Sequence, residues 1–145
     1  ELQKGMKKGG PEGAIQVCHT VAKKLADSTS QQLGWNISRT SLKVRNPENA
    51  PDSWELQILD EFEKRKDQGG DITKMEHYET IQTNEKKVFR YMKAIPTSGL
   101  CLSCHGQSLS TKVIEQLDTL YPEDQARGFE IGDIRGAFTI TRPID

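Results

Sequence analysis

The sequence predicts a single α+β domain over residues 1–145, with an antiparallel sheet and helices before, between and after its strands. The length of 145 residues is that of one domain. Segments with a helical spacing of apolar residues are interspersed with short segments of strand composition. Two of the strand segments are joined at Thr83-Asn84-Glu85 as a hairpin, which pairs them antiparallel.

The first predicted helix runs from Pro11 to about Ser28. Pro11 suits the first turn of a helix, and Glu12 is favoured at the positive end of the helix dipole. At ~100° per residue, one broad apolar stripe forms and is expected to face the core. Its members are Ala14, Ile15, Val17, Cys18, Val21, Ala22, Leu25 and Ala26, with Cys18 near the centre.

The other elements follow in chain order. A strand is predicted over 34–44, where apolar residues change from odd to even positions and indicate a bulge or bend midway. Asp52 or Ser53 caps a helix over 54–65. Strands over 73–82 and 87–95 form the hairpin, a helix near 110–120 begins at Ser110 or Thr111, and a last strand covers 132–142.

Two of the three cysteines belong to the run Cys101-Leu102-Ser103-Cys104-His105, the signature for covalent attachment of a c-type haem. Each thiol at this spacing can form a thioether to one vinyl group of a porphyrin. The imidazole of His105 then lies under the metal, where a neutral nitrogen binds the iron axially. The sequence therefore predicts one covalent haem c, attached through Cys101 and Cys104 and ligated by His105.

Other interpretations of the cysteines fit less well. A thioredoxin-like redox pair needs a strand-to-helix turn in a βαβ unit, and no βαβ pattern surrounds the motif. A zinc site could use Cys18, Cys101, Cys104 and one histidine, but a typical structural site brings two paired clusters. A disulfide between the motif cysteines leaves His105 unexplained.

Cytochrome iron is usually six-coordinate, so the sequence should supply a second axial ligand or leave an open position. The candidates are Cys18, His19, His77, Met6, Met75 and Met92. Cys18 has the strongest case, because an unpaired thiol in an oxidising compartment is a liability unless it is buried or bound to metal. Its thiolate would stabilise ferric iron. An inert buried cysteine is the alternative.

Two predicted strands offer further haem contacts. Arg39 shares a strand face with Trp35 and Ile37 and is expected to pair with a haem propionate, with Arg45 and Lys43 as alternatives. A solvated charge is the other interpretation of each. The last strand places Gly132, Ile134, Gly136, Phe138 and Ile140 on one face, where the missing glycine side chains would let a flat ring approach, unless they mark bends.

Composition narrows the class of function. Lysine and arginine number 20 against 21 aspartates and glutamates, and this balance argues against nucleic-acid binding. The chain is 34% apolar and 6% aromatic, a thin core that a buried apolar cofactor would complete. No stretch approaches a membrane-spanning helix. Glu1 opens a polar segment without an initiator methionine, so we expect a removed leader or a trimmed sequence.

Several runs resemble the PAS-like haem-c-binding family of bacteria and cyanobacteria, long catalogued as a domain of unknown function. They are Gly34 to Pro51, Trp54-Glu55, Cys101 to Gly106, Tyr121 to Ala126 and Gly132 to Phe138, and the resemblance spans about Gly10 to Thr141. It implies a PAS-like antiparallel sheet with flanking helices around one covalent haem. It also implies axial ligation by His105 and Cys18. Members of the family act as cytochrome-like proteins or as extracytoplasmic sensor modules.

These observations predict a monohaem c-type cytochrome with His/Cys ligation that acts in electron transfer or redox sensing and is not an enzyme. The alternative is a gas sensor in which reduction releases Cys18 and opens the iron to a diatomic ligand. Because haem c is attached outside the cytoplasm, the expected location is the periplasm or a lumen. The expected partner is a redox protein whose identity the sequence does not give.

Overall fold

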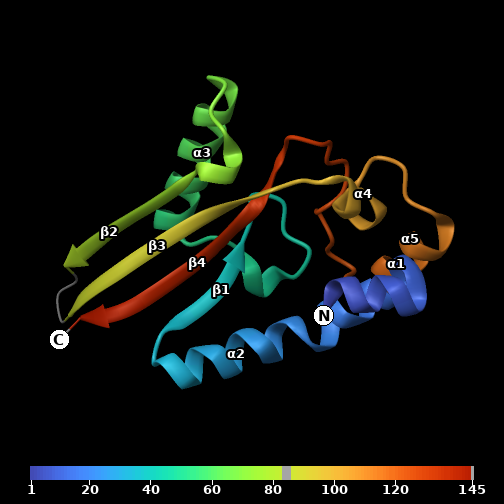
Figure 1. Ribbon diagram of the computed structural model, residues 1–145, viewed down its shortest axis with the longest axis horizontal. Coiled ribbons are helices and arrows are strands. Elements are labelled where there is room, and N and C mark those ends of the chain that lie inside the picture. Colours follow the sequence, from blue (N-terminus) through green and yellow to red (C-terminus); the bar gives the residue numbers. More distant parts are fainter. Residues whose placement is uncertain (83–85, 145) are drawn as a thin grey trace.

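The computed structural model describes residues 1–82 and 86–144, and it shows one antiparallel sheet flanked by helices (Figure 1). The strands are β1 (Asn36–Thr40), β2 (Glu76–Gln82), β3 (Lys87–Pro96) and β4 (Ile134–Ile144), in the order β1-β4-β3-β2. All three neighbouring pairs are antiparallel. The predicted α+β class is confirmed. The expected turn at residues 83–85 lies outside the described residues.

The helices are α1 (Leu2–Thr20), α2 (Ala22–Leu33), α3 (Ser53–Asp67), α4 (Gly99–His105) and α5 (Thr111–Leu120). Short 3-10 turns cover Pro47–Asn49 and Ile72–Lys74. Of the predicted bulge or bend in the first strand segment, the structure has no bulge but does bend at Leu42 and Lys43. Strand β1 pairs without interruption and ends at Thr40, so the change of phase marks the end of a strand.

The predicted helix over residues 11–28 is two helices in the structure. Pro11 does begin a regular segment, because Gly9 and Gly10 interrupt α1 just before it, with Gly10 at φ 60° and ψ −155°. The second break lies at Val21, where α1 gives way to α2. Thr20 Oγ1 donates to the Gln16 carbonyl oxygen at 2.8 Å, a bond that bends helices.

Helix α3 covers one face of the sheet and forms the larger core. Its apolar face packs on side chains of β3, β4 and the Ile72–Lys74 turn, and the members of this cluster are Ile58, Leu59, Phe62, Ile72, Met75, Met92, Ala94, Ile134 and Ala137. Asp52, one of the two predicted caps, is the N-cap, and it forms a capping box with Glu55. Met75 and Met92, two of the alternative axial ligands, are thus core residues.

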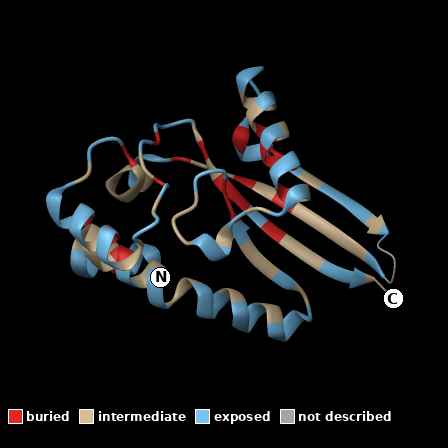
Figure 2. Ribbon diagram, turned by 180° about the vertical axis from the view of Figure 1, so that it is seen from behind, coloured by how far each residue is buried: buried red, intermediate tan, exposed pale blue. Residues whose placement is uncertain are grey.

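A smaller core joins α1, α4 and α5 at the end of the molecule away from the β2–β3 hairpin (Figures 1 and 2). Ile15, Val113 and Leu117 form its centre, and Cys104 and Tyr121 pack against it. Helix α2 contributes no buried residue. The expectation that Leu25 faces the core is therefore wrong, since its side chain is 50% exposed.

Candidate functional site

Helix α4 carries the CxxCH motif. Cys101, Cys104 and His105 occupy positions i, i+3 and i+4, which lie on one face of a helix. Ser98 precedes the helix, and its backbone N–H donates to Cys101 Sγ at 3.4 Å. All three motif side chains are half-buried. One short helix therefore presents two thiols and an imidazole to the same side.

The imidazole of His105 is held through Nδ1, which lies 2.8 Å from the Ala126 carbonyl oxygen. Phe129 meets the ring edge-on, with 6.1 Å between ring centres. Burial, together with the charges of Arg135 and Arg45, lowers the pKa of His105 to about 3. The ring is therefore neutral at pH 7 and keeps a nitrogen lone pair for a metal.

Arg45 ties the end of α4 to the segment over 121–128. Its Nη2 donates to the Cys104 carbonyl oxygen at 2.6 Å and to the Ala126 carbonyl oxygen at 3.1 Å. Its Nε donates to Asp124 Oδ1 at 3.1 Å. The guanidinium thus fixes both the motif and the carbonyl that holds His105. The predicted contact between Arg45 and a haem propionate stays a prediction.

Cys18 lies near the motif, toward the end of α1, and is half-buried. Cys104 Sγ is 3.9 Å from the Pro11 carbonyl oxygen, which joins α4 to α1. Burial raises the pKa of the Cys104 thiol, and Cys18 is close enough to raise it further. Burial also raises the pKa of Tyr121, again with a contribution from Cys18. The structure therefore brings all three cysteines to one end of the molecule.

The two histidines outside the motif lie on α1 and on β2. His19 is exposed and meets the Tyr121 ring edge-on at 5.3 Å between ring centres. His77 lies on β2, with Nε2 3.4 Å from Glu79 Oε1 and its ring against Trp54. His19 thus lies beside Tyr121, which packs on the same small core as Cys104, whereas His77 lies against α3.

Arg39 and Phe138 form a pair across β1 and β4. Ala137 belongs to the core under α3, so alternation along β4 places Phe138 on the opposite face, where its side chain is 47% exposed. Arg39 is exposed, and its charge acts on Tyr121 and Arg135. Both residues are thus on the side of the sheet from which the motif can be reached.

The predicted common face from Gly132 to Ile140 is wrong at its start. Strand β4 begins only at Ile134, which is buried in the α3 core, and a bulge follows because Ile95 pairs with Gly136 and Pro96 with Ile134. A side chain at Gly136 would collide with the Thr40 carbonyl oxygen. The close approach of β1 explains this glycine, and a contact with haem at Gly136 stays a prediction.

Sequence reasoning missed Arg135, the extra residue of this bulge. Its Nε donates toward His105 Nδ1 at 3.1 Å, its Nη1 lies 3.3 Å from Ser41 Oγ, and its guanidinium is 5.2 Å from the centre of the Phe129 ring. Burial, with the charges of Arg45 and Arg39, lowers the pKa of Arg135 to about 10, so it stays cationic at pH 7. Its signal in the sequence was the glycine beside it, which marks the bulge.

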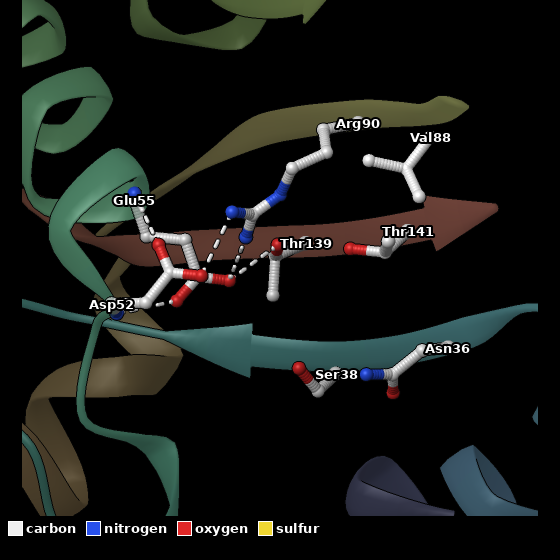
Figure 3. A pocket seen from close by; sticks show the side chains of 8 residues that line it. All are labelled: Asn36, Ser38, Asp52, Glu55, Val88, Arg90, Thr139 and Thr141. Atoms are coloured by element: carbon white, nitrogen blue, oxygen red, sulfur yellow. Dashed lines mark hydrogen bonds and ion pairs between the residues drawn. The ribbon is translucent and has the colours of Figure 1, made fainter. Parts of the chain in front are cut away.

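A polar cavity of about 250 Å³ lies on the α3 side of the sheet, between β1, β3, β4 and the start of α3 (Figure 3). Arg90 reaches into it and pairs with Asp52 at 2.8 Å and with Glu55 at 3.2 Å. Thr139 Oγ1 donates to Glu55 at 2.7 Å. The eight lining residues include no cysteine or histidine. This network attaches α3 to the sheet and is separate from the motif.

Two further findings concern metal binding and membrane-spanning helices. Within residues 1–82 and 86–144, no three His, Cys, Asp or Glu side chains gather closely enough to hold a metal ion, so the zinc interpretation gains no support. In the same residues no helix is long and apolar enough to cross a membrane.

Comparisons with known proteins point in one direction. The model of the Tll0287-like family matches residues 2–143. The crystal structure of the cyanobacterial heme-protein Tll0287 superimposes with a TM-score of 0.65 and 29% sequence identity, covering 84% of this chain and 69% of that one. No curated protein sequence matches.

Proposed function

From the premise that the chain belongs to the Tll0287-like family, we propose that it is a monohaem c-type cytochrome with His/Cys-ligated iron that acts in electron transfer or redox sensing. Its similarity to a cyanobacterial heme-protein supports haem as the cofactor. The motif on α4 supports the covalent, c-type attachment.

The observation that carries this proposal is the state of His105. A metal-binding histidine typically donates its second ring N–H to a carbonyl, which fixes the tautomer and the ring orientation. The Ala126 carbonyl oxygen lies 2.8 Å from Nδ1, and within the described residues the bonds to this ring involve Nδ1 alone. His105 therefore fits an axial ligand that binds through Nε2.

The two motif cysteines fit the thioether attachment. They lie one helical turn apart on the same face as His105, and neither is in a disulfide. A bound haem supplies an iron that changes between the ferric and ferrous states. The chain supplies a fixed imidazole, an apolar sheet face at Phe138 and cationic side chains nearby.

Cys18 is the second axial ligand in this proposal. The packing of α1 against α4 and α5 supports it, because this packing brings Cys18 within electrostatic reach of Cys104 and Tyr121. A thiolate donates strongly and stabilises ferric iron. Because such a ligand lowers the potential, the proposed protein is a low-potential electron carrier or redox sensor. We propose further that it is not an enzyme and that it acts outside the cytoplasm, where haem c is attached.

One observation favours the alternative of a gas sensor. The distortion at Val21 follows Cys18 by three residues, and α2 beyond it contributes no buried residue. Reduction weakens the bond between a thiolate and iron, so movement at this break could withdraw Cys18 and open the iron to carbon monoxide, nitric oxide or oxygen.

Absorption spectra of the haem-loaded protein and its Cys18→Ala variant test the ligand. The wild type should be low-spin when oxidised, and the variant should lose that spectrum and bind added ligands. The matched control is His19→Ala, which alters the neighbouring exposed residue and should leave the spectrum unchanged. Identical spectra for Cys18→Ala and the wild type would remove Cys18 from the ligand set.

Carbon monoxide separates the two candidate functions. A sensor that releases Cys18 on reduction should bind carbon monoxide in the ferrous wild type. An electron carrier that keeps both ligands should not bind it, whereas its Cys18→Ala variant should.

A further inference from the structure

Arg135 is a half-buried cation without a counter-ion among the residues that the structure describes. Its guanidinium is near Ser41, His105 and the Phe129 ring, none of which is negatively charged. The nearby carboxylate, Asp124, is engaged by Arg45 and Arg127. Removing a charge from most of its water is costly unless the charge is paired, so this position favours an anion.

The hydrogen bonds at His105 Nδ1 lead to the same conclusion. The Ala126 carbonyl can only accept a hydrogen bond, and Arg135 Nε can only donate one. One nitrogen cannot satisfy both partners in the same tautomer. The tautomer with hydrogen on Nδ1 bonds to Ala126 and leaves the Nε2 lone pair for iron, and in that state Arg135 Nε needs another acceptor.

The bulge in β4 sets Arg135 in place. A bulge re-aims the side chain of its extra residue, and here it turns Arg135 toward the CxxCH motif. Ser41 Oγ donates to the Arg135 carbonyl oxygen at 2.8 Å and also lies 3.3 Å from the guanidinium. The backbone and the side-chain tip are thus fixed by one hydroxyl. This arrangement presents a rigid, planar fork of N–H donors, the shape that suits a carboxylate.

We propose that Arg135 binds a haem propionate, and that this ion pair leaves His105 Nδ1 to the Ala126 carbonyl and so selects the tautomer that ligates iron. The proposal rests on the haem assignment made above. It makes Arg135 a binding residue for the cofactor carboxylate and a positioning residue for His105. Arg39, exposed and close enough for its charge to act on Arg135, is suited to the second propionate.

The test compares haem-loaded wild type with Arg135→Gln and Arg135→Lys. The matched control is Arg65→Gln. Arg65 also lies over a phenylalanine ring, 5.7 Å from the centre of Phe62, but it belongs to α3, where it donates to the Glu76 carbonyl oxygen. The two readouts are the midpoint potential and the propionate bending band in the resonance Raman spectrum. A crystal structure of the haem-loaded wild type gives a third.

Loss of a cation beside the iron favours the ferric state, so Arg135→Gln should lower the midpoint potential and shift the propionate band. Arg135→Lys should restore part of both changes because it keeps the charge, and Arg65→Gln should change neither. In the crystal, the guanidinium should lie within about 3.2 Å of a propionate oxygen.

Two results would overturn the proposal. One is an Arg135→Gln protein with the potential and propionate band of the wild type. The other, which needs no variant to fold, is a haem-loaded wild-type crystal in which Arg135 still bonds to His105 Nδ1. A wild-type preparation without any haem contradicts the proposed function itself and is distinguished at once by its lack of colour.

Discussion

Asp124 is the residue on which the geometry around the motif most depends. Its side chain is only 1% exposed and accepts hydrogen bonds from Arg45 Nε, Arg127 Nε and the Ala126 backbone N–H. Burial alone would raise the pKa of Asp124, but the bonds from Arg127, Arg45 and Ala126 outweigh it, and the pKa lies below its ordinary value. The carboxylate therefore holds in place both Arg45 and the segment that bears the Ala126 carbonyl.

We expect Asp124→Asn to destabilise the protein by about 2–4 kcal/mol at pH 7, because two arginines lose a buried counter-charge. The free energy of unfolding in urea measures this loss. The matched control is Asp118→Asn, which removes a 61% exposed partner of Arg127 and should cost less than about 1 kcal/mol. Equal losses in the two variants would contradict the role given to Asp124.

The effect of Asp124→Asn on the free energy of unfolding should depend on pH. The folded-state pKa of Asp124 is depressed, so its contribution to stability is complete above the unfolded value of about 3.8 and is lost as the pH falls through the folded value. The stability difference between wild type and Asp124→Asn should therefore be constant near neutrality and shrink in acid below about pH 4.

For single residues, the sequence predicts the chemistry of the site but not the contacts that support it. Cys101, Cys104 and His105 are recognised from spacing alone, and Cys18 from its place on an apolar stripe. Arg135 is not, because its role depends on a bulge that appears only when β3 and β4 are paired. The pairing of Arg45 with Asp124, 79 residues away, is likewise not visible in the sequence, whereas the predicted contact of Arg45 with a propionate stays a prediction.

Helix α3 is the element whose start the sequence predicts best. The capping box of Asp52 and Glu55 satisfies backbone N–H groups at its first turn, and both carboxylates also pair with Arg90 of β3. The cap is therefore both a local signal and a tertiary connection. Its position on the far face of the sheet from Phe138 separates it from the haem motif.

Asp52→Ala should lower the free energy of unfolding by about 1–2 kcal/mol, through the lost cap and one lost partner of Arg90. The absorption spectrum of the haem-loaded variant should match the wild type, since the network lies apart from the motif. Thermal unfolding and the spectrum are the two measurements. A changed spectrum would show that the two faces of the sheet are coupled.

Helices α1 and α2 show which features of the sequence predict a helix boundary and which boundaries they miss. Pro11 and Glu12 predict the start of a helical segment, and the structure has a regular segment from there, but it also has helix from Leu2 that was not predicted. The break at Val21 was not predicted, because the apolar stripe continues across it. The distortion is small, because the backbone N–H of Val21 still donates to the Val17 carbonyl oxygen and that of Leu25 to the Val21 carbonyl oxygen.

The described residues contain two small hydrophobic cores, and the motif borders the smaller one through Cys104. One lies between α3 and the sheet, and the other joins α1, α4 and α5. The fold class could be predicted from the sequence because strand composition and caps are local. The packing of α1 against α4 and α5 could not be predicted, since it joins segments about a hundred residues apart. One example is the hydrogen bond that Gln116 Nε2 donates to the Glu12 carbonyl oxygen.

Phe138 and Arg39 are exposed on the sheet face opposite α3, and the half-buried cysteines lie on α1 and α4. A covalent haem would bury apolar surface such as that of Phe138. The central claim is therefore that Cys101 and Cys104 hold this group by thioether bonds and His105 ligates its iron.

The intact mass of the denatured protein, produced in cells that mature c-type cytochromes, tests this claim most directly. The wild type should weigh the polypeptide plus one haem and keep its colour after acid and organic extraction. A variant with both Cys101→Ala and Cys104→Ala should weigh the bare polypeptide under the same treatment. A wild-type mass equal to that of the polypeptide alone would contradict the account.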